Sequence, residues 1–273
     1  MKRMIMDRRM MLAGVGTVVA GSLLSNRAVA GSLEPPGPPA PTGKSTDQLA
    51  GMIARPNGVS EPRTPVAGLP SGAASRYVIS APGSYCLTEN IIGLPGVNGI
   101  QIDSDNVDLD LQGFHMTADP GMPGASTVAI LVSGGQNQCI YNGTIEGWTI
   151  GVDVQNASKF LLWDVTVIGA SDTGFKLGHD GQAYDLDVYS CPVGYDAPGL
   201  RTIIEECGAW SCPIAIQCNG SQNLIVGNCA TSSPVGPFMI GQGNSYGPIV
   251  VVTGVGNIGA VVGSNHPLAN FVF

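Results

Sequence analysis

Charged side chains are scarce in this sequence, at 12% of its residues, and basic ones are nearly absent after residue 74. Sixteen Asp and Glu from residue 75 onward face only four basic residues, which are Arg76, Lys159, Lys176 and Arg201. A nucleic-acid binder needs a basic track that neutralises phosphates, so nucleic acid is excluded as a partner. Anionic polysaccharides are repelled too, unless calcium bridges the two acidic molecules.

Motifs of several enzyme classes are also missing. The sequence lacks the paired Asp-Asp that a polygalacturonase-like glycosidase uses as acid and base. It has no Ser–His–Asp order, no P-loop and no dinucleotide fingerprint. Its seven cysteines include no CxxC spacing, which argues against a zinc site. The sequence therefore carries no strong enzymatic signature.

The first thirty residues have the pattern of an export signal. A basic start is followed by the uncharged run 13–24 and by the small-x-small site Ala28-Val29-Ala30. The stretch Asp7–Leu12 resembles a twin-arginine signal, and an ordinary secretory signal is the alternative. The apolar run is too short for a membrane-spanning helix, which needs about 20 residues. We expect residues 1–30 to direct export to the periplasm, cell surface or extracellular space, with no transmembrane anchor in the mature chain.

Composition divides the remaining chain in two. Residues 31–74 hold nine of the twenty prolines and lack apolar periodicity, which predicts an extended N-terminal extension acting as a spacer or strap. Residues 75–273 are rich in Gly, Val, Ile and Asp throughout, and their length suits one domain with a continuous core. We expect the end caps of this domain in the Pro-rich extension and in the irregular C-terminal tail.

A repeated phrase predicts the fold. Ser190-Cys191-Pro192, Ser211-Cys212-Pro213 and Ser233-Pro234 follow one another at a period of 21 residues, which is typical of a solenoid. Units of this length are too short for a strand–helix pair and fit short strands joined by Gly, Asn, Asp and Pro turns. Apolar pairs recur at the same rhythm, and we expect them to point inward: Ile130/Val132, Val152/Val154, Phe175/Leu177, Ile214/Ile216 and Phe238/Ile240.

The predicted architecture is all-β: a single-stranded parallel β-helix of about 7–8 coils over residues 75–273, with a C-terminal cap. Parallel crossover connections are strongly biased to one hand, so we expect the helix to be right-handed. Cys191 and Cys212, and separately Cys207 and Cys229, are expected to be neighbours on adjacent coils. Stacked strands hold such side chains at about 4.8 Å, wider than a disulfide prefers, which favours buried thiols over bridges.

Several segments resemble one family, the exported bacterial right-handed parallel β-helix repeat proteins of the pectate-lyase-like superfold. They are Gly83–Thr88, Ile100–Phe114, Asn142–Gly147, Leu33–Thr42, Glu61–Pro65 and Asn265–Phe271. The resemblance spans nearly the whole mature chain and implies this fold. It implies no particular activity, because related β-helices include lyases, glycosidases, epimerases and adhesins.

One polar column suggests a metal site. The spacing aligns Asp164, Asp187 and Glu206 on successive coils, between Asn142 and Asn228. Carboxylates about 4.8 Å apart repel one another unless one is protonated, a cation lies between them, or they turn into solvent. The alternatives are therefore a calcium site, an acid/base pair, or solvated turn residues.

A second column, predicted to face solvent, suggests catalysis. Asp153, Lys176 and Asp196 align on successive strands as acid, base and acid. Such a group could act beside a carboxylate-bound cation, as in lyase-type β-helices, or form a surface ladder of ion pairs. The neighbouring His179-Asp180 pair is weaker evidence. Some aromatic side chains could stack on sugar rings: Trp148, Trp163, Trp210, Tyr184, Tyr189 and Tyr195.

Two functions remain open at this point. The first is a non-catalytic exported β-helix that acts as a structural or glycan-binding element of the cell envelope or extracellular space. The second is a calcium-assisted polysaccharide enzyme of the lyase or epimerase type, using the Asp153 column. An extracellular polysaccharide is the expected partner in either case.

Overall fold

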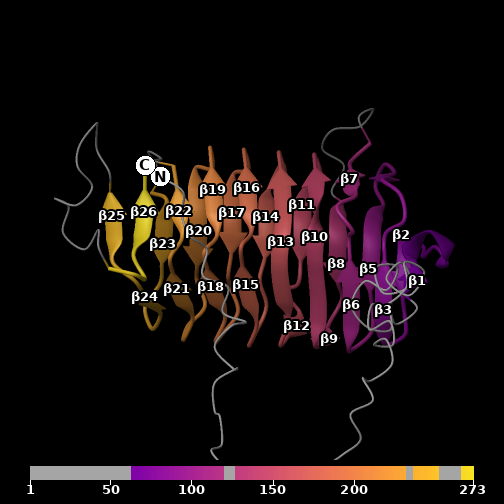
Figure 1. Ribbon diagram of the computed structural model, residues 1–273, viewed down its shortest axis with the longest axis horizontal. Coiled ribbons are helices and arrows are strands. Elements are labelled where there is room, and N and C mark those ends of the chain that lie inside the picture. The colour runs from indigo at the N-terminus through magenta and orange to yellow at the C-terminus, as the bar shows by residue number, and fades with distance from the viewer. Residues whose placement is uncertain (1–62, 120–126, 232–235, 252–265) are drawn as a thin grey trace, which may run out of the picture. The chain divides into compact units, whose positions relative to one another are not determined.

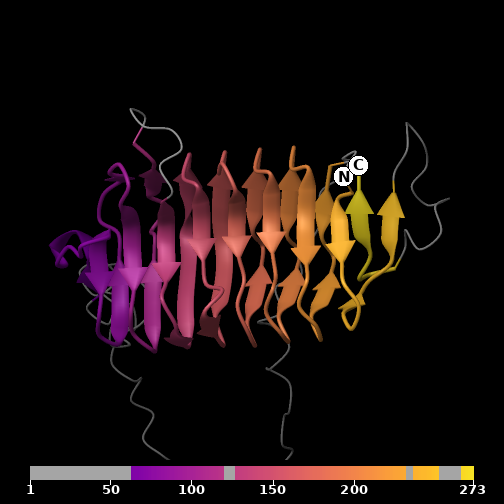
Figure 2. The ribbon, with the colours of Figure 1, turned by 180° about the vertical axis from the view of Figure 1, so that it is seen from behind.

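The structure is a computed structural model that describes residues 63–119, 127–231, 236–251 and 266–273. These residues form an all-β parallel solenoid of about 8 turns, as the period predicted. Figure 1 shows the strands stacked in chain order, from indigo β1 to yellow β25 and β26, and Figure 2 shows the opposite face. Every pairing between named strands is parallel. The single helical element among the described residues is the 3-10 turn η2, Val66–Gly68.

An eight-stranded sheet forms one face of the stack. In spatial order its strands are β2 (Ser75–Ile79), β5 (Asn98–Ile102), β8 (Val128–Val132), β11 (Ile150–Asp153), β14 (Thr173–Lys176), β17 (Val193–Asp196), β20 (Ile214–Cys218) and β23 (Phe238–Ile240). Each coil contributes one strand, so strands adjacent in space belong to successive turns.

A sixteen-stranded sheet wraps the other side and bends once along each coil. Before the bend lies a first panel: β1 (Thr64–Pro65), β3 (Gly83–Cys86), β6 (Val107–Asp110), the start of β10 (Gln138–Glu146), the start of β13 (Leu161–Ile168), β15 (Gln182–Tyr184), β18 (Ile203–Glu205), β21 (Leu224–Val226) and β24 (Ser245–Tyr246). After the bend lies a second panel: β4 (Ile91–Ile92), β7 (His115–Thr117), the ends of β10 and β13, β16 (Asp187–Tyr189), β19 (Gly208–Trp210), β22 (Cys229–Ala230), β26 (Asn270–Val272) and β25 (Ile249–Val251). A small sheet pairs β9 (Gly135–Gln136) with β12 (Ala157–Ser158).

The coil turns its corners on single residues in the left-handed conformation. The corner that leads into the first panel uses Asn106, Asn137, Lys159, Asp180, Arg201 and Gln222, with φ between 51° and 62° for such non-glycine residues. The corner between the panels uses Asn142, Asp164, Asp185, Glu206 and Gly227, and the third uses Gly147, Gly169, Ser190 and Ser211. Asn and Asp tolerate this conformation better than most residues, which explains why these types recur there.

The inward columns confirm most of the predicted core. The side chains of Ile130/Val132, Val152/Val154 and Phe175/Leu177 are all buried. The predicted inward pair Ile214/Ile216 was shifted by two residues along its strand. Tyr195 pairs with Ile216, so the inward pair of that coil is Ile216/Cys218, and Ile214 lies half-buried opposite Val193. Phe238/Ile240 occupy the predicted columns but are half-buried in the last coil.

The cysteine prediction holds for one pair and fails for the other. Cys191 and Cys212 are vertical neighbours whose thiols donate to the backbone carbonyls of Tyr189 and Trp210, and the cysteines form no disulfide within the described residues. Cys229 instead pairs with Gly208, because the backbone of Cys207 aligns with Asn228. The third copy of the Ser-Pro phrase, Ser233-Pro234, lies outside the described residues, as do residues 1–62.

Two buried asparagine ladders stabilise the later coils from inside. The Asn223 Oδ1 accepts the Thr202 N–H at 2.7 Å, and the Asn244 Oδ1 accepts the Asn223 N–H at 3.0 Å. In the second ladder the Asn228 Oδ1 accepts the Cys207 N–H at 2.9 Å, and Asn270 repeats this contact with the Asn228 N–H at 3.1 Å. The amides thus satisfy backbone groups that the corners remove from the strand ladders.

The two ends of the solenoid are built differently. At the N-terminal end, β1 pairs with β3, so strand pairing begins before residue 75, and the Val66 side chain is fully buried on the core. At the C-terminal end, β26 inserts between β22 and β25. The strand β25 is thereby displaced to the outer edge.

Candidate functional site

The eight-stranded sheet aligns Asp153, Lys176 and Asp196. Asp153 on β11 pairs with Lys176 on β14, which pairs with Asp196 on β17. Next in the column is Gln217 on β20, which sequence reasoning had not included. The three candidate residues therefore lie on three adjacent strands, because the strand register is kept from each coil to the next.

Burial changes the chemistry expected of this column. Asp153 was predicted to face solvent, but it is only 5% exposed. Burial raises the pKa of its carboxyl, while the hydrogen bond from the Gln155 N–H and the charge of Lys176 oppose that rise. The Asp153 Oδ1 accepts the Gln155 N–H at 3.1 Å. This carboxyl is thus held in place by its own turn.

Asp196 is not held by its own turn as Asp153 is, and its side chain interacts with Gln217 of the next strand. Its Oδ1 atom is buried and accepts no hydrogen bond in the structure. Burial raises the pKa of Asp196, Lys176 lowers it, and the carboxylates of Asp172 and Asp153 raise it further. The Asp196 carboxyl therefore keeps its proton to higher pH than an ordinary aspartate.

Lys176 is engaged by a residue outside the predicted column. Its Nζ lies 3.3 Å from the Asp172 Oδ2, in the segment just before β14. Asp172 lies in the bend immediately before the strand, so a search among strand residues alone does not include it. A base for β-elimination needs a free lone pair aimed at the substrate. The ion pair keeps the Lys176 amine turned to a carboxylate instead.

The predicted metal column is divided by the fold. Asp164 and Glu206 lie at the corner between the panels, but the residue between them is Asp185, not Asp187. The Asp164 N–H donates to the Asp185 carbonyl at 3.0 Å, which fixes this alignment. A constant step of 21 residues, from Asp164 to Asp185 to Glu206 to Gly227, was the signal that could have found it.

Asp187 belongs to a strand column of the second panel. It pairs with Thr166 and Gly208, and its Oδ1 accepts the Trp210 Nε1–H at 3.2 Å. The corner carboxylates are exposed, which leaves them hydrated. Burial and the neighbouring Asp185 raise the pKa of Asp164. Within the described residues no three His, Cys, Asp or Glu side chains are grouped to hold a metal ion.

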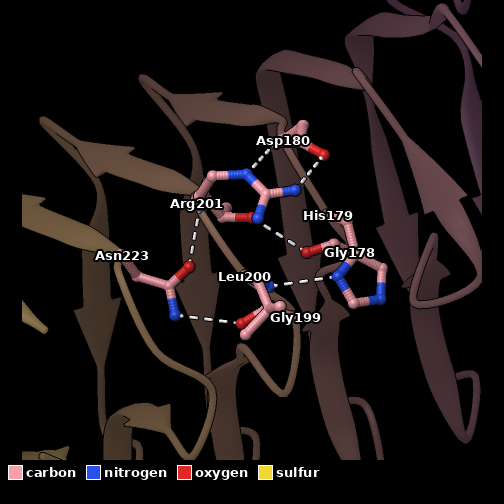
Figure 3. Close-up of polar contacts among 8 residues, drawn as sticks. Gly178, His179, Asp180, Gly199, Leu200, Arg201 and Asn223 are labelled. Carbon is pink, nitrogen blue, oxygen red and sulfur yellow. Dashed lines mark hydrogen bonds and ion pairs between the residues drawn. The ribbon is translucent and has the colours of Figure 1, made fainter. Parts of the chain in front are cut away.

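The corner that leads into the first panel carries the best-connected ionic contacts (Figure 3). Arg201 holds Asp180 of the preceding coil through two contacts, including Nη2 to Oδ2 at 2.8 Å, and this pairing lowers the pKa of Asp180. The His179 Nδ1 accepts the Leu200 N–H at 3.2 Å. The His179-Asp180 pair therefore acts in stacking the coils, with both groups directed along the solenoid.

The candidate sugar-binding aromatics separate into two groups. Trp148 and Tyr195 are buried in the core. Trp163 stacks between Tyr141 and Tyr184, with ring centroids 4.7 and 6.1 Å away, so its faces are covered. Arg63 closes this ladder at Tyr141, 5.9 Å from the ring centroid.

On the second panel, Tyr189 is 38% exposed beside Trp210. It is the aromatic side chain of the predicted set that is most open to a ligand.

Arg63 and Asp110 form a contact that the sequence had not indicated. The Arg63 guanidinium pairs with the Asp110 carboxylate, and its Nη2 donates to the Tyr141 hydroxyl at 2.8 Å. Asp110 is buried in this contact.

In comparisons with known proteins, no family model matches this chain, and no curated protein or solved structure matches it significantly. Across the described residues, no helix has the length and hydrophobicity to cross a lipid bilayer.

Proposed function

We propose that this chain is an exported, right-handed β-helix of the bacterial repeat type, and that it acts without catalysis. Its role is that of a structural or glycan-binding element of the cell envelope or extracellular space. The observation that carries the proposal is the state of its cationic groups. Lys176, Arg201 and Arg63 are each paired with a carboxylate of the same chain, whereas Lys159 and Arg76 donate to the neutral side chains of Gln136 and Tyr77.

Because three of these basic side chains are paired with carboxylates of the same chain, the surface is suited to binding rather than to proton transfer. The paired cations supply neither a free base nor a positive groove that would hold a uronate carboxylate. The remaining acidic excess favours neutral or amino-bearing polysaccharides over anionic ones. Tyr189 supplies the aromatic surface that such a sugar would contact, since it is more exposed than Tyr184 and since both faces of Trp163 are stacked against tyrosines.

A polysaccharide panel tests the proposal. The purified chain should be retained by neutral or amino-sugar polymers, should release no product from them, and should show no retention on polygalacturonate. Tyr189→Ala should weaken retention, while Tyr184→Ala, a matched change in a covered ring, should leave it unchanged. Product release from any polymer would reject the non-catalytic role, and failure to bind would leave only the structural role.

A calcium-assisted polysaccharide enzyme is the second candidate. It is favoured by the two carboxyls with raised pKa, Asp153 and Asp196, on either side of Lys176. On that mechanism, pectate or alginate with calcium would give an unsaturated product that absorbs in the ultraviolet and disappears in Lys176→Ala. We expect no such product near neutral pH, with or without calcium, and no rise in melting temperature on adding calcium.

A further inference from the structure

Among the described residues, inward apolar side chains are exposed at the C-terminal end of the solenoid. Ile225 and Tyr246 occupy the same inward column, yet Ile225 is fully buried and Tyr246 is 55% exposed. Asn270 and Ile249 repeat this contrast on the second panel, where Ile249 is 40% exposed. These side chains face the position that a further coil would occupy.

At the N-terminal end the inward side chains are covered, although Ile92 on the edge strand β4 is 58% exposed. There Val66, on the turn η2, is fully buried in the core, and Leu69 packs against the same cluster. The N-terminal end also carries Arg63 and Arg76, whose guanidinium groups contact Tyr141 and Tyr77. The two ends therefore differ in how far their inward side chains are covered.

Charge distinguishes the two ends as well. No Asp, Glu, Lys or Arg follows Glu206 in the sequence, so the last coils contain no charged side chain. Solvent-exposed strand edges are usually protected by such charges, which prevent pairing with another chain. Here β23, β24 and β25 end their sheets without a further partner strand among the described residues. Their outer edges therefore have no partner strand within the described part of the chain and carry exposed apolar side chains.

We propose that this end is a self-association surface, formed by Met239, Tyr246, Ile249 and Leu268, at which a second copy of the chain docks tail to tail. The distribution of charge indicates that the docking partner is a second copy of the chain. The rest of the domain is acidic and repels its copy, whereas the uncharged ends can approach without that penalty. A two-fold axis brings the same patch together from both copies and gives a closed dimer. Edge strands β25 of the two copies would pair antiparallel. This inference does not depend on the proposed function.

Sedimentation of the purified full chain tests the proposal. A dimer is expected at micromolar concentration. Ile249→Lys and Tyr246→Lys should each weaken it by about a hundredfold or more, because two-fold symmetry places every introduced charge in the interface twice. Tyr246→Ser, which adds no charge, should weaken it less. Far-ultraviolet circular dichroism on each variant shows whether the solenoid itself is intact.

Ile92→Lys is the matched control at the opposite end, since Ile92 is also an exposed apolar residue on an edge strand. It should leave the dimer unchanged. Dissociation by Ile92→Lys would indicate head-to-tail pairing and overturn the tail-to-tail arrangement. A monomeric wild-type chain, as expected if another segment or a different protein covers this end, would overturn the proposal. So would folded lysine variants that remain dimeric.

Discussion

Asn228→Ala should be among the most destabilising single changes in this protein. The side chain is 1% exposed and joins two coils from within the corner. Its Oδ1 accepts the Cys207 N–H at 2.9 Å, and its Nδ2 donates to the Ile204 carbonyl at 3.0 Å. Alanine provides neither group, and water has no access to the site.

The size of the effect follows from the groups left without partners. Each buried polar group that loses its partner costs about 1–3 kcal/mol. The Cys207 N–H and the Ile204 carbonyl lose this contact, so we expect a loss of about 3 kcal/mol in the free energy of unfolding. For a domain of this size, about 1 kcal/mol shifts the melting temperature by roughly 2–4 °C. The variant should therefore melt about 6–12 °C below the wild type.

Thermal and urea denaturation measure this loss. Asn156→Ala is the matched control, because that asparagine is exposed and should change stability by less than about 0.5 kcal/mol. Asn228→Asp keeps the acceptor for Cys207 but places a carboxylate against the Ile204 carbonyl, so its stability should fall as pH rises. If Asn228→Ala has the same melting temperature as Asn156→Ala, the amide ladder does not stabilise the coils and the reasoning is wrong.

Three further predictions address packing, titration and the thiols. Gly199→Ala should cost about 3 kcal/mol or more, because its Cβ would lie 1.7 Å from the Gly178 carbonyl oxygen, whereas Gly68→Ala, with open space, should be nearly neutral in denaturation. The folded-state pKa of Asp153 is raised above 3.8, so the folded protein binds more protons than the unfolded chain, and wild-type stability should fall as pH rises through that raised pKa. Melting curves of Asp153→Asn should lack this pH-dependent fall. The same pH profile in the variant and the wild type would contradict the prediction. Thiol titration in denaturant without reductant should find seven reactive cysteines, and a smaller number would reveal bridges.

Parts of the site followed from spacing alone. Asp153, Lys176 and Asp196 were placed correctly in one column because their strands keep register through the coils between them. Asp187 was misplaced because similar short phrases were aligned, while the corners keep a step of 21 residues. Cys229 was misplaced by one position for the same reason. Alignment errors of this kind matter because a shift of one residue turns a side chain from the core to the surface.

What the sequence determined by itself is the solenoid: the period, the turn residues and the alternation of apolar side chains are local properties of the chain, and stacking is the arrangement that buries them all. Only the tertiary structure decided which polar groups are buried and what they contact. The burial of Asp153, the Arg63–Asp110 pair and the ion pair of Lys176 with Asp172 depend on side chains brought together by coiling. The exposure of Tyr246 and Ile249 among the described residues likewise depends on the stacking of the last coils, because their counterparts Ile225 and Asn270 are buried in the same columns.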